Sequence, residues 1–184
     1  MKTIKFLSMA ILAGSFLASC SSDDNSPEEI NEEETITTMT VTLTPDGGGT
    51  AIELQTRDLD GDGPNPPVIT VSGNLAASTT YNGSIELLNE TETPAEDITE
   101  EVAEEDDEHQ FIFETSGSIA SVSYSDEDGD GNPVGLAFAL TTDTAGSATF
   151  TVILRHEPKK PNNGTKEDAG GETDITQTFN LTVE

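Results

Sequence analysis

Most apolar residues in this chain alternate with threonine or serine, and this two-residue period is the feature that most constrains the fold. Such alternation is typical of β-strands that bury one face. Glycine, proline and asparagine separate the alternating segments and favour tight turns. We therefore expect an all-β fold, either an antiparallel sandwich or a barrel-like sheet. The predicted strands cover residues 38–45, 50–58, 67–73, 79–90, 109–117, 120–126, 134–142, 147–157 and 173–184.

One segment departs from the strand pattern. The stretch TPAE at 93–96 combines an N-cap residue, a proline at the first helical position and a glutamate three residues after the cap. Ile98 and Val102 then lie four residues apart, and acidic residues fill the other positions. This pattern predicts one short acidic helix over 94–106.

The N-terminus has the features of an export signal. Two lysines precede an apolar run at 6–17, which is too short to cross a bilayer, so residues 1–19 are predicted to be a signal peptide. The sequence LASC at 17–20 resembles the lipobox of bacterial lipoproteins, which implies cleavage before Cys20 and attachment of lipid to its sulfur. An ordinary secretory signal followed by a chance cysteine is the alternative. Cys20 is the only cysteine, so no disulfide can form within the chain.

Residues 20–34 are polar and acidic, and they predict a flexible tether between the lipid anchor and one domain at 35–184. The sequence SSDD directly after Cys20 resembles the surface-export signal of Bacteroidetes lipoproteins. This resemblance implies an outer-membrane lipoprotein exposed on the cell surface. Without that export, the domain faces the periplasm.

The chain is strongly acidic, with 36 aspartates and glutamates against 7 lysines and arginines and a formal net charge of −29. This charge argues against nucleic acid and anionic lipid as partners, and it suits cations or a basic protein surface. Arg155, Lys159, Lys160 and Lys166 gather within and after the predicted strand 147–157. We expect these side chains to pair with the acidic helix of their own chain; docking on a partner is the alternative.

Two aspartate-rich loops, RDLDGDGP at 57–64 and SDEDGDGNP at 125–133, contain the opening half of a calcium-binding loop. An EF-hand needs a glutamate at the twelfth position, but Ile69 and Ala137 stand there, so neither loop is an EF-hand. Calcium would need further oxygen ligands from the fold, and an ordinary polar turn is the alternative. The calcium candidates are Asp58, Asp60, Asp62, Asp126, Asp128 and Asp130.

The similar placement of these loops also predicts an internal repeat. Each loop follows a predicted strand and precedes another. Two related β units, at 35–107 and 108–184, would explain the similarity. The alternative is that a sequence rich in threonine, glycine and aspartate aligns easily with itself.

The two histidines of the chain are candidate transition-metal ligands. His109 begins one predicted strand, and His156 lies at the end of another. If these strands are antiparallel neighbours, the two imidazoles come together with Glu108 and Glu157. Two histidines with carboxylates suit zinc or copper. The alternative is that both histidines are surface residues at strand ends.

The sequence contains no recognisable catalytic motif. It has no Gly-x-Ser-x-Gly, no cysteine available as a nucleophile within the domain and no phosphate-binding glycine loop. Carboxylates are abundant, but they lie in acidic runs for which solvation is the ordinary explanation. We therefore predict that the protein is not an enzyme, and no catalytic residue is assigned.

Several longer segments resemble a family of small flavobacterial lipoproteins, among them TVTLTPDGGG, RDLDGDGP, NGSIELLNE, LRHEPKKPNNG and GGETDITQTFNLTV. Members are found beside TonB-dependent outer-membrane receptors, and some are labelled as type 1 periplasmic binding folds. That label implies a two-lobed α/β protein, whereas the strand pattern here predicts all-β. We therefore expect a non-enzymatic binding or accessory lipoprotein that captures or presents a ligand to such a receptor, and the two histidines make a divalent metal the first ligand to test. The alternative is a structural or adhesive surface module whose Asp-rich turns bind calcium.

Overall fold

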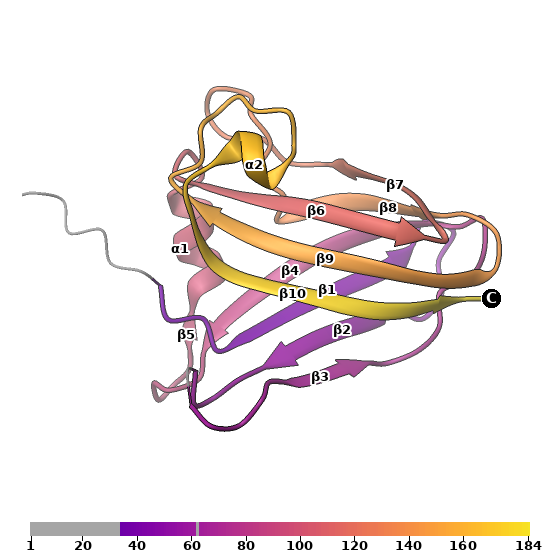
Figure 1. Cartoon of the computed structure of the whole chain (residues 1–184), viewed down its shortest axis with the longest axis horizontal. Helices are drawn as coiled ribbons and strands as arrows, with labels where there is room; N and C mark the ends of the chain where they lie inside the picture. Colours follow the sequence, from indigo (N-terminus) through magenta and orange to yellow (C-terminus); the bar gives the residue numbers. More distant parts are fainter. Residues whose placement is uncertain (1–33, 62) are drawn as a thin grey trace, which may run out of the picture. The chain divides into compact units, whose positions relative to one another are not determined.

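The computed structural model describes residues 34–61 and 63–184, and it confirms the all-β prediction (Figure 1). Two antiparallel sheets lie in two layers, as in a β-sandwich. The predicted signal peptide at 1–19, Cys20 and nearly all of the tether at 20–34 lie outside the described residues. Asp62, one of the calcium candidates, also lies outside them.

The larger sheet has the strand order β3-β2-β1-β4-β8-β7, with the short β5 paired to β4. It forms the rear layer of Figure 1. Its strands are β1 (Thr38–Pro45), β2 (Ile52–Arg57), β3 (Val68–Val71), β4 (Thr80–Asn89), β5 (Glu96–Asp97), β7 (Ile119–Tyr124) and β8 (Ala137–Thr142).

The smaller sheet has the order β10-β9-β6 and forms the front layer. It consists of β6 (His109–Gly117), β9 (Gly146–His156) and β10 (Glu172–Val183). The chain passes from the smaller sheet to the larger after β6 and returns after β8. Within the described part of the chain, β9 is the only strand that pairs with β6 or β10, and Val183 at the end of β10 also forms an isolated bridge with Leu75.

The hydrophobic core fills the space between the sheets, as the two-residue period requires. In β1, Met39, Val41 and Leu43 are fully buried, and the threonines between them are partly exposed. Phe111 and Phe150 of the smaller sheet belong to the same buried cluster. Each such side chain contributes roughly 1.5–3 kcal/mol when it is fully buried.

One end of the smaller sheet is covered on its outer face as well. Ile112 of β6 and Ile153 of β9 pack there against Ala169, which belongs to the short helix α2 (Lys166–Ala169). The last five residues of β9 are consequently all buried. This doubly covered end of the sheet carries both histidines.

The predicted helix exists but is shorter than the sequence pattern indicates. Helix α1 (Ile98–Glu104) begins at Ile98, and its N-cap is Asp97, whose side chain accepts a hydrogen bond from the Thr99 backbone. The prediction of a start at 94 is wrong because Glu96 and Asp97 pair with β4 instead of entering the helix. Ile98 and Val102 are buried, as the four-residue spacing indicates. Helix α2 was not expected from the sequence.

The two halves proposed as repeat units share their sheets. Strand β8 of the second half pairs with β4 of the first, and residues from both halves form one core cluster. The described residues from Glu34 onward belong to one compact unit. A duplication in the ancestry of the sequence stays a prediction, but the halves at 35–107 and 108–184 do not form separate bodies.

The helices in the described part of the chain are too short to pass through a lipid bilayer.

Candidate metal centre

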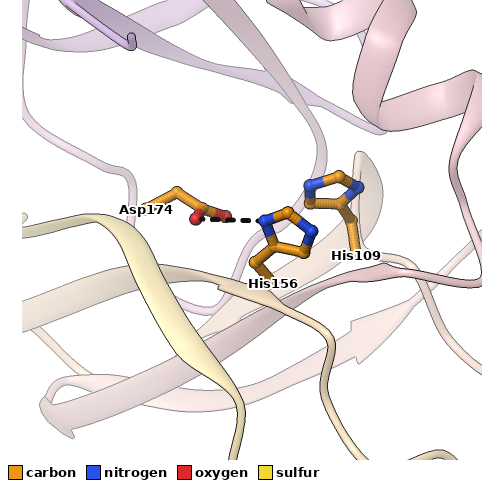
Figure 2. Close-up of side chains that lie close together, drawn as sticks. All are labelled: His109, His156 and Asp174. Carbon is orange, nitrogen blue, oxygen red and sulfur yellow. Dashed lines mark ion pairs between the residues drawn. The ribbon is translucent and has the colours of Figure 1, made fainter. Parts of the chain in front are cut away.

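His109 and His156 face each other across neighbouring antiparallel strands (Figure 2). The β6–β9 register places them directly opposite one another, with ring centroids 4.7 Å apart and ring planes inclined by 34°. His109 is 0% exposed and His156 is 6% exposed. They are therefore buried residues, and the alternative that they lie on the surface is wrong.

The strand period explains why both rings point inward. Phe111, two residues after His109, and Leu154, two residues before His156, both belong to the core. His109 is further oriented by the turn after α1. Its Nδ1 lies 3.2 Å from the carbonyl oxygen of Glu105, which can only accept a hydrogen bond, so Nδ1 carries the proton. In the neutral ring, Nε2 then presents a lone pair.

Asp174 is the third member of the cluster, and a β-bulge brings it there. The β9–β10 register passes from Thr173 opposite Arg155 to Ile175 opposite Leu154, which leaves Asp174 as the extra residue. Its Oδ1 lies 3.8 Å from His156 Nδ1, and its side chain is only 1% exposed. Figure 2 shows this carboxylate approaching the His156 ring.

Glu34, just before β1, closes the cluster on the side of His109. Its Oε2 lies 3.2 Å from His109 Nε2, and its side chain is 8% exposed. Three atoms of this cluster are buried without a hydrogen-bond partner among the described residues: Glu34 Oε2, His109 Nε2 and Asp174 Oδ2. An unsatisfied buried polar group ordinarily costs about 1–3 kcal/mol, so three in one cluster need an explanation.

The pKa values of the cluster show how its charges interact. Burial raises the pKa of Asp174 to about 6, and the nearby Glu34 carboxylate acts in the same direction, against the two histidines and Arg155. For His109, burial favours the neutral ring. The Glu34 carboxylate and the Glu105 carbonyl outweigh that effect, so the pKa of His109 is raised above its usual value. Protons and metal ions would compete for the same atoms.

The predicted ligands Glu108 and Glu157 lie on the solvent side of His156. Glu108 Oε2 is 3.9 Å from His156 Nε2, and the Glu108 side chain is 49% exposed. Glu108, His156 and Glu157 each offer a ligand atom within 4.8 Å of the others. Glu157 is exposed, and its backbone N–H donates to the Glu108 carbonyl oxygen at 2.7 Å.

Arg155 and Gly171 hold the chain segment that leads into the bulge. The buried Arg155 guanidinium donates to the carbonyl oxygens of Gly170 and Gly171 and to the Thr173 hydroxyl. A Cβ atom at Gly171 would lie 2.2 Å from the His156 carbonyl oxygen, and φ there is +68°. Glycine is therefore required at this position, directly beside one of the histidines.

The second Asp-rich loop is satisfied by donors of its own chain. Asp126 accepts from the backbone N–H groups of Gly135 and Ala137, at 2.7 and 2.9 Å. Asp128 accepts from the backbone of Asp130 and Asn132 and from the Asn132 amide. Burial alone would raise the pKa of Asp128, but the Asn132 donors, Lys160 and the Asp130 backbone lower it to about 2.

The first Asp-rich loop is more open. Asp58 accepts from the Asp60 backbone, and Asp60 accepts from the side-chain amide of Asn65 at 2.7 Å. The described aspartates of the two loops do not gather into a set of converging ligand atoms. This geometry favours the polar-turn alternative over calcium at both loops.

Lys159 and Lys160, which follow β9, pair with acids of their own chain, though not with α1 side chains as expected. Lys160 lies 3.2 Å from Asp128 in a buried ion pair, and it also donates to the carbonyl oxygen of Asp106, in the turn after α1. Lys159 lies 3.2 Å from Asp168 of α2. These contacts fasten the segment that covers the outer face of the smaller sheet.

Sequence reasoning named both histidines but missed Asp174 and Glu34. In β10, the buried residues Phe179, Leu181 and Val183 are two apart, and extending this period backwards places Asp174 on the outer face. The β-bulge shifts the period by one residue, so that Asp174 lies on the inner face instead. No sequence pattern distinguishes Glu34 as a candidate ligand, because it is one of many acidic residues in an acidic stretch. Comparisons with protein-family models, curated proteins and solved structures found no match to this chain.

Proposed function

We propose that this protein binds a divalent transition-metal ion, zinc first, inside the sandwich. The ligands are His109, His156 and Asp174, with Glu34 as the fourth. Two imidazoles with carboxylates are a donor set that zinc and copper take. The role is that of a non-enzymatic binding protein, as the absence of a recognisable catalytic motif in the sequence also suggests.

The observation that carries the proposal is the group of buried atoms without hydrogen-bond partners among the described residues. Ligand atoms of His109, His156 and Asp174 lie within 4.8 Å of one another, and so do those of Glu34, Glu105 and His109, so His109 links the two groups that we propose share one cation. Two ligands of a tetrahedral zinc ion lie about 3.3 Å apart when each bond is about 2.0–2.1 Å long. The 3.2 Å between His109 Nε2 and Glu34 Oε2 fits this value.

The orientation of His109 supports the same proposal. Metal-bound histidines ordinarily donate their second ring N–H to a carbonyl or carboxylate, which fixes the ring and its tautomer. The Glu105 carbonyl oxygen accepts from His109 Nδ1 in this way. The competing explanation is a protonated His109 paired with Glu34 without any metal, and the experiment below separates the two.

We further propose that the protein acts outside the cytoplasm. The lipobox and the acidic residues after Cys20 support a lipid anchor in the outer membrane and exposure on the cell surface. In this setting the bound metal is supplied to, or held beside, a TonB-dependent receptor. Incorporation of labelled palmitate into the wild type, and its loss in Cys20→Ser, tests the anchor.

Thermal unfolding of the mature chain carrying Cys20→Ser tests the metal proposal. The chain is first stripped with EDTA, and zinc, copper or calcium is then added in turn. A ligand that binds only the folded state at 100 times its Kd stabilises it by about 2.7 kcal/mol. For a domain of this size we expect zinc to raise the Tm by about 5–10 °C.

The variants His109→Gln and Asp174→Asn should each lose most of the zinc-induced rise. Glu53→Gln, an exposed acid on the larger sheet, should keep it and serves as the matched control. Circular dichroism shows whether each variant folds. If zinc and copper leave the wild-type Tm unchanged, the metal proposal is wrong. If calcium alone raises it, the structural module with Asp-rich turns is the better description.

A further inference from the structure

His156 lies at the boundary between the buried cluster and solvent, and its two ring nitrogens face opposite ways. Nδ1 is 3.8 Å from Asp174, whose side chain is 1% exposed, whereas Nε2 is 3.9 Å from Glu108, whose side chain is 49% exposed. Both distances exceed hydrogen-bonding range, and neither nitrogen makes a hydrogen bond to any residue that the structure describes. The His156 side chain, which is only 7% exposed, therefore presents one ring nitrogen to the buried Asp174 carboxylate and the other to the exposed Glu108 carboxylate.

The outer set is held together by the strand ends. Glu108 directly precedes β6, and Glu157 directly follows β9. Pairing of these strands brings the two acids together, and the Glu157 N–H bonds to the Glu108 carbonyl oxygen. Glu157 adopts φ +47°, a left-handed conformation that costs a residue with a side chain about 1–2 kcal/mol. The ligand atoms of Glu108, His156 and Glu157 lie within 4.8 Å of one another.

We infer that Glu108 and Glu157, with His156, form an outer divalent-cation site through which the ion enters the buried centre. This inference rests on the proposed function. Exposed carboxylates can take an ion that still carries most of its water, whereas the inner ligands require it to shed that water. Clustered negative charge also raises the local concentration of cations at the entrance. The outer site binds weakly and transiently, and the inner site holds the ion.

Removal of an entry site and removal of a permanent metal ligand change the rates of zinc binding in different ways. A transient site on the path lowers the barrier in both directions, so its removal slows association and dissociation together and leaves the Kd nearly unchanged. A permanent ligand behaves differently, because its loss speeds dissociation and raises the Kd. The two cases are therefore separated by measuring both rates.

The test uses Glu108→Gln/Glu157→Gln in the mature chain carrying Cys20→Ser. Stopped-flow mixing with zinc and a chromogenic zinc indicator gives the association rate, and an EDTA chase gives the dissociation rate. We expect both rates to fall by about 10-fold, at the lower end of the range for charge-assisted entry, and the Kd to change less than about 3-fold. Glu53→Gln/Glu86→Gln removes the same charge from the exposed face of the larger sheet and should leave both rates unchanged.

The outcomes separate this inference from the function on which it rests. His109→Gln should abolish tight zinc binding in the same assay while leaving Glu108 and Glu157 in place. If the zinc association and dissociation rates of Glu108→Gln/Glu157→Gln equal those of the control pair, the two acids do not form an entry site. Faster dissociation with a raised Kd would also overturn it, because the two acids would then be ligands of the final site. A wild type that binds no zinc removes the proposed function and the entrance together.

Discussion

The carboxyl group of Asp174 lies inside the sandwich, beside another acid and two imidazoles. Its folded pKa of about 6 exceeds the value of about 3.9 for an unfolded chain. The folded state therefore keeps this proton at pH values where the unfolded state has lost it. Stability from this group is full below about pH 4, and it is lost as the pH rises through 6.

Asp174→Asn should consequently stabilise the metal-free protein at pH 7.5. A neutral amide avoids the buried charge, and we expect the free energy of unfolding to rise by about 2 kcal/mol in urea titrations with EDTA present. The gain should disappear near pH 3, where the wild-type carboxyl is protonated in both states. Asp130→Asn, in an exposed loop position, is the control. If Asp174→Asn destabilised the protein at pH 7.5, the explanation that Asp174 carries a costly buried charge would be wrong.

The titration of His109 also makes the folded state less stable as the pH rises, as that of Asp174 does. Because its folded pKa is raised, it contributes stability below its unfolded pKa of about 6.5, and this contribution is lost as the pH rises through the folded value. Zinc replaces protons on the same atoms. The stabilisation by zinc in the thermal experiment should therefore be smaller at pH 5 than at pH 7.5.

At the scale of elements, the bulge in β10 decides which residue joins the histidines. The turn before it passes close under the end of β9, where Gly171 lies against the His156 carbonyl oxygen. The neighbouring Gly170 has a similar φ of +61°, but a Cβ atom there would meet nothing within 4 Å. The two glycines therefore form a matched pair that separates backbone strain from close contact.

Gly170→Ala should cost roughly 1–3 kcal/mol of unfolding free energy, because φ +61° combined with ψ −144° is a backbone conformation that residues with a side chain rarely adopt. Gly171→Ala should cost about 1–3 kcal/mol more, because the added methyl group forces His156 or the turn to move. Chemical denaturation measures both values, and the zinc-induced rise in Tm should fall only in Gly171→Ala. Equal effects of the two substitutions would show that the contact with His156 does not position the site.

At the scale of the whole molecule, the two halves of the chain depend on each other. Strand β8 extends the sheet begun by β1 to β4, and one core cluster spans both sheets. Residues 35–107 contain strands of the larger sheet alone, and the whole smaller sheet comes from residues 108–184. We therefore expect residues 34–184 to unfold in a single cooperative transition.

The two tyrosines make this expectation measurable, because the chain has no tryptophan. Tyr81 lies in β4 of the first half and Tyr124 in β7 of the second, and each hydroxyl makes one hydrogen bond to backbone. In Tyr124→Phe, fluorescence reports Tyr81 alone, and in Tyr81→Phe it reports Tyr124 alone. In each variant the fluorescence and circular dichroism transitions in urea should coincide. Separate midpoints for the two tyrosines would indicate two independently folding units.

The sequence by itself determined the strands, and it identified the pairing of the two histidines as one of two alternatives. Every predicted strand forms, because alternation of apolar and hydroxyl side chains can bury only one face of an extended chain. His109 and His156 could be placed together because one begins a strand and the other ends one.

Only the tertiary structure decided the rest of the candidate site. Asp174 enters it through a one-residue bulge that reverses the period, and no local signal marks that bulge. Glu34 enters because the chain before β1 passes beside His109. The Asp-rich loops carried the strongest motif, but neighbouring backbone N–H groups and Lys160 occupy the carboxylates of the second loop. The backbone donors lie within the loop or just after it, but Lys160 is 32 residues from Asp128 in the sequence. A local pattern cannot specify which distant side chain the fold will bring to a carboxylate.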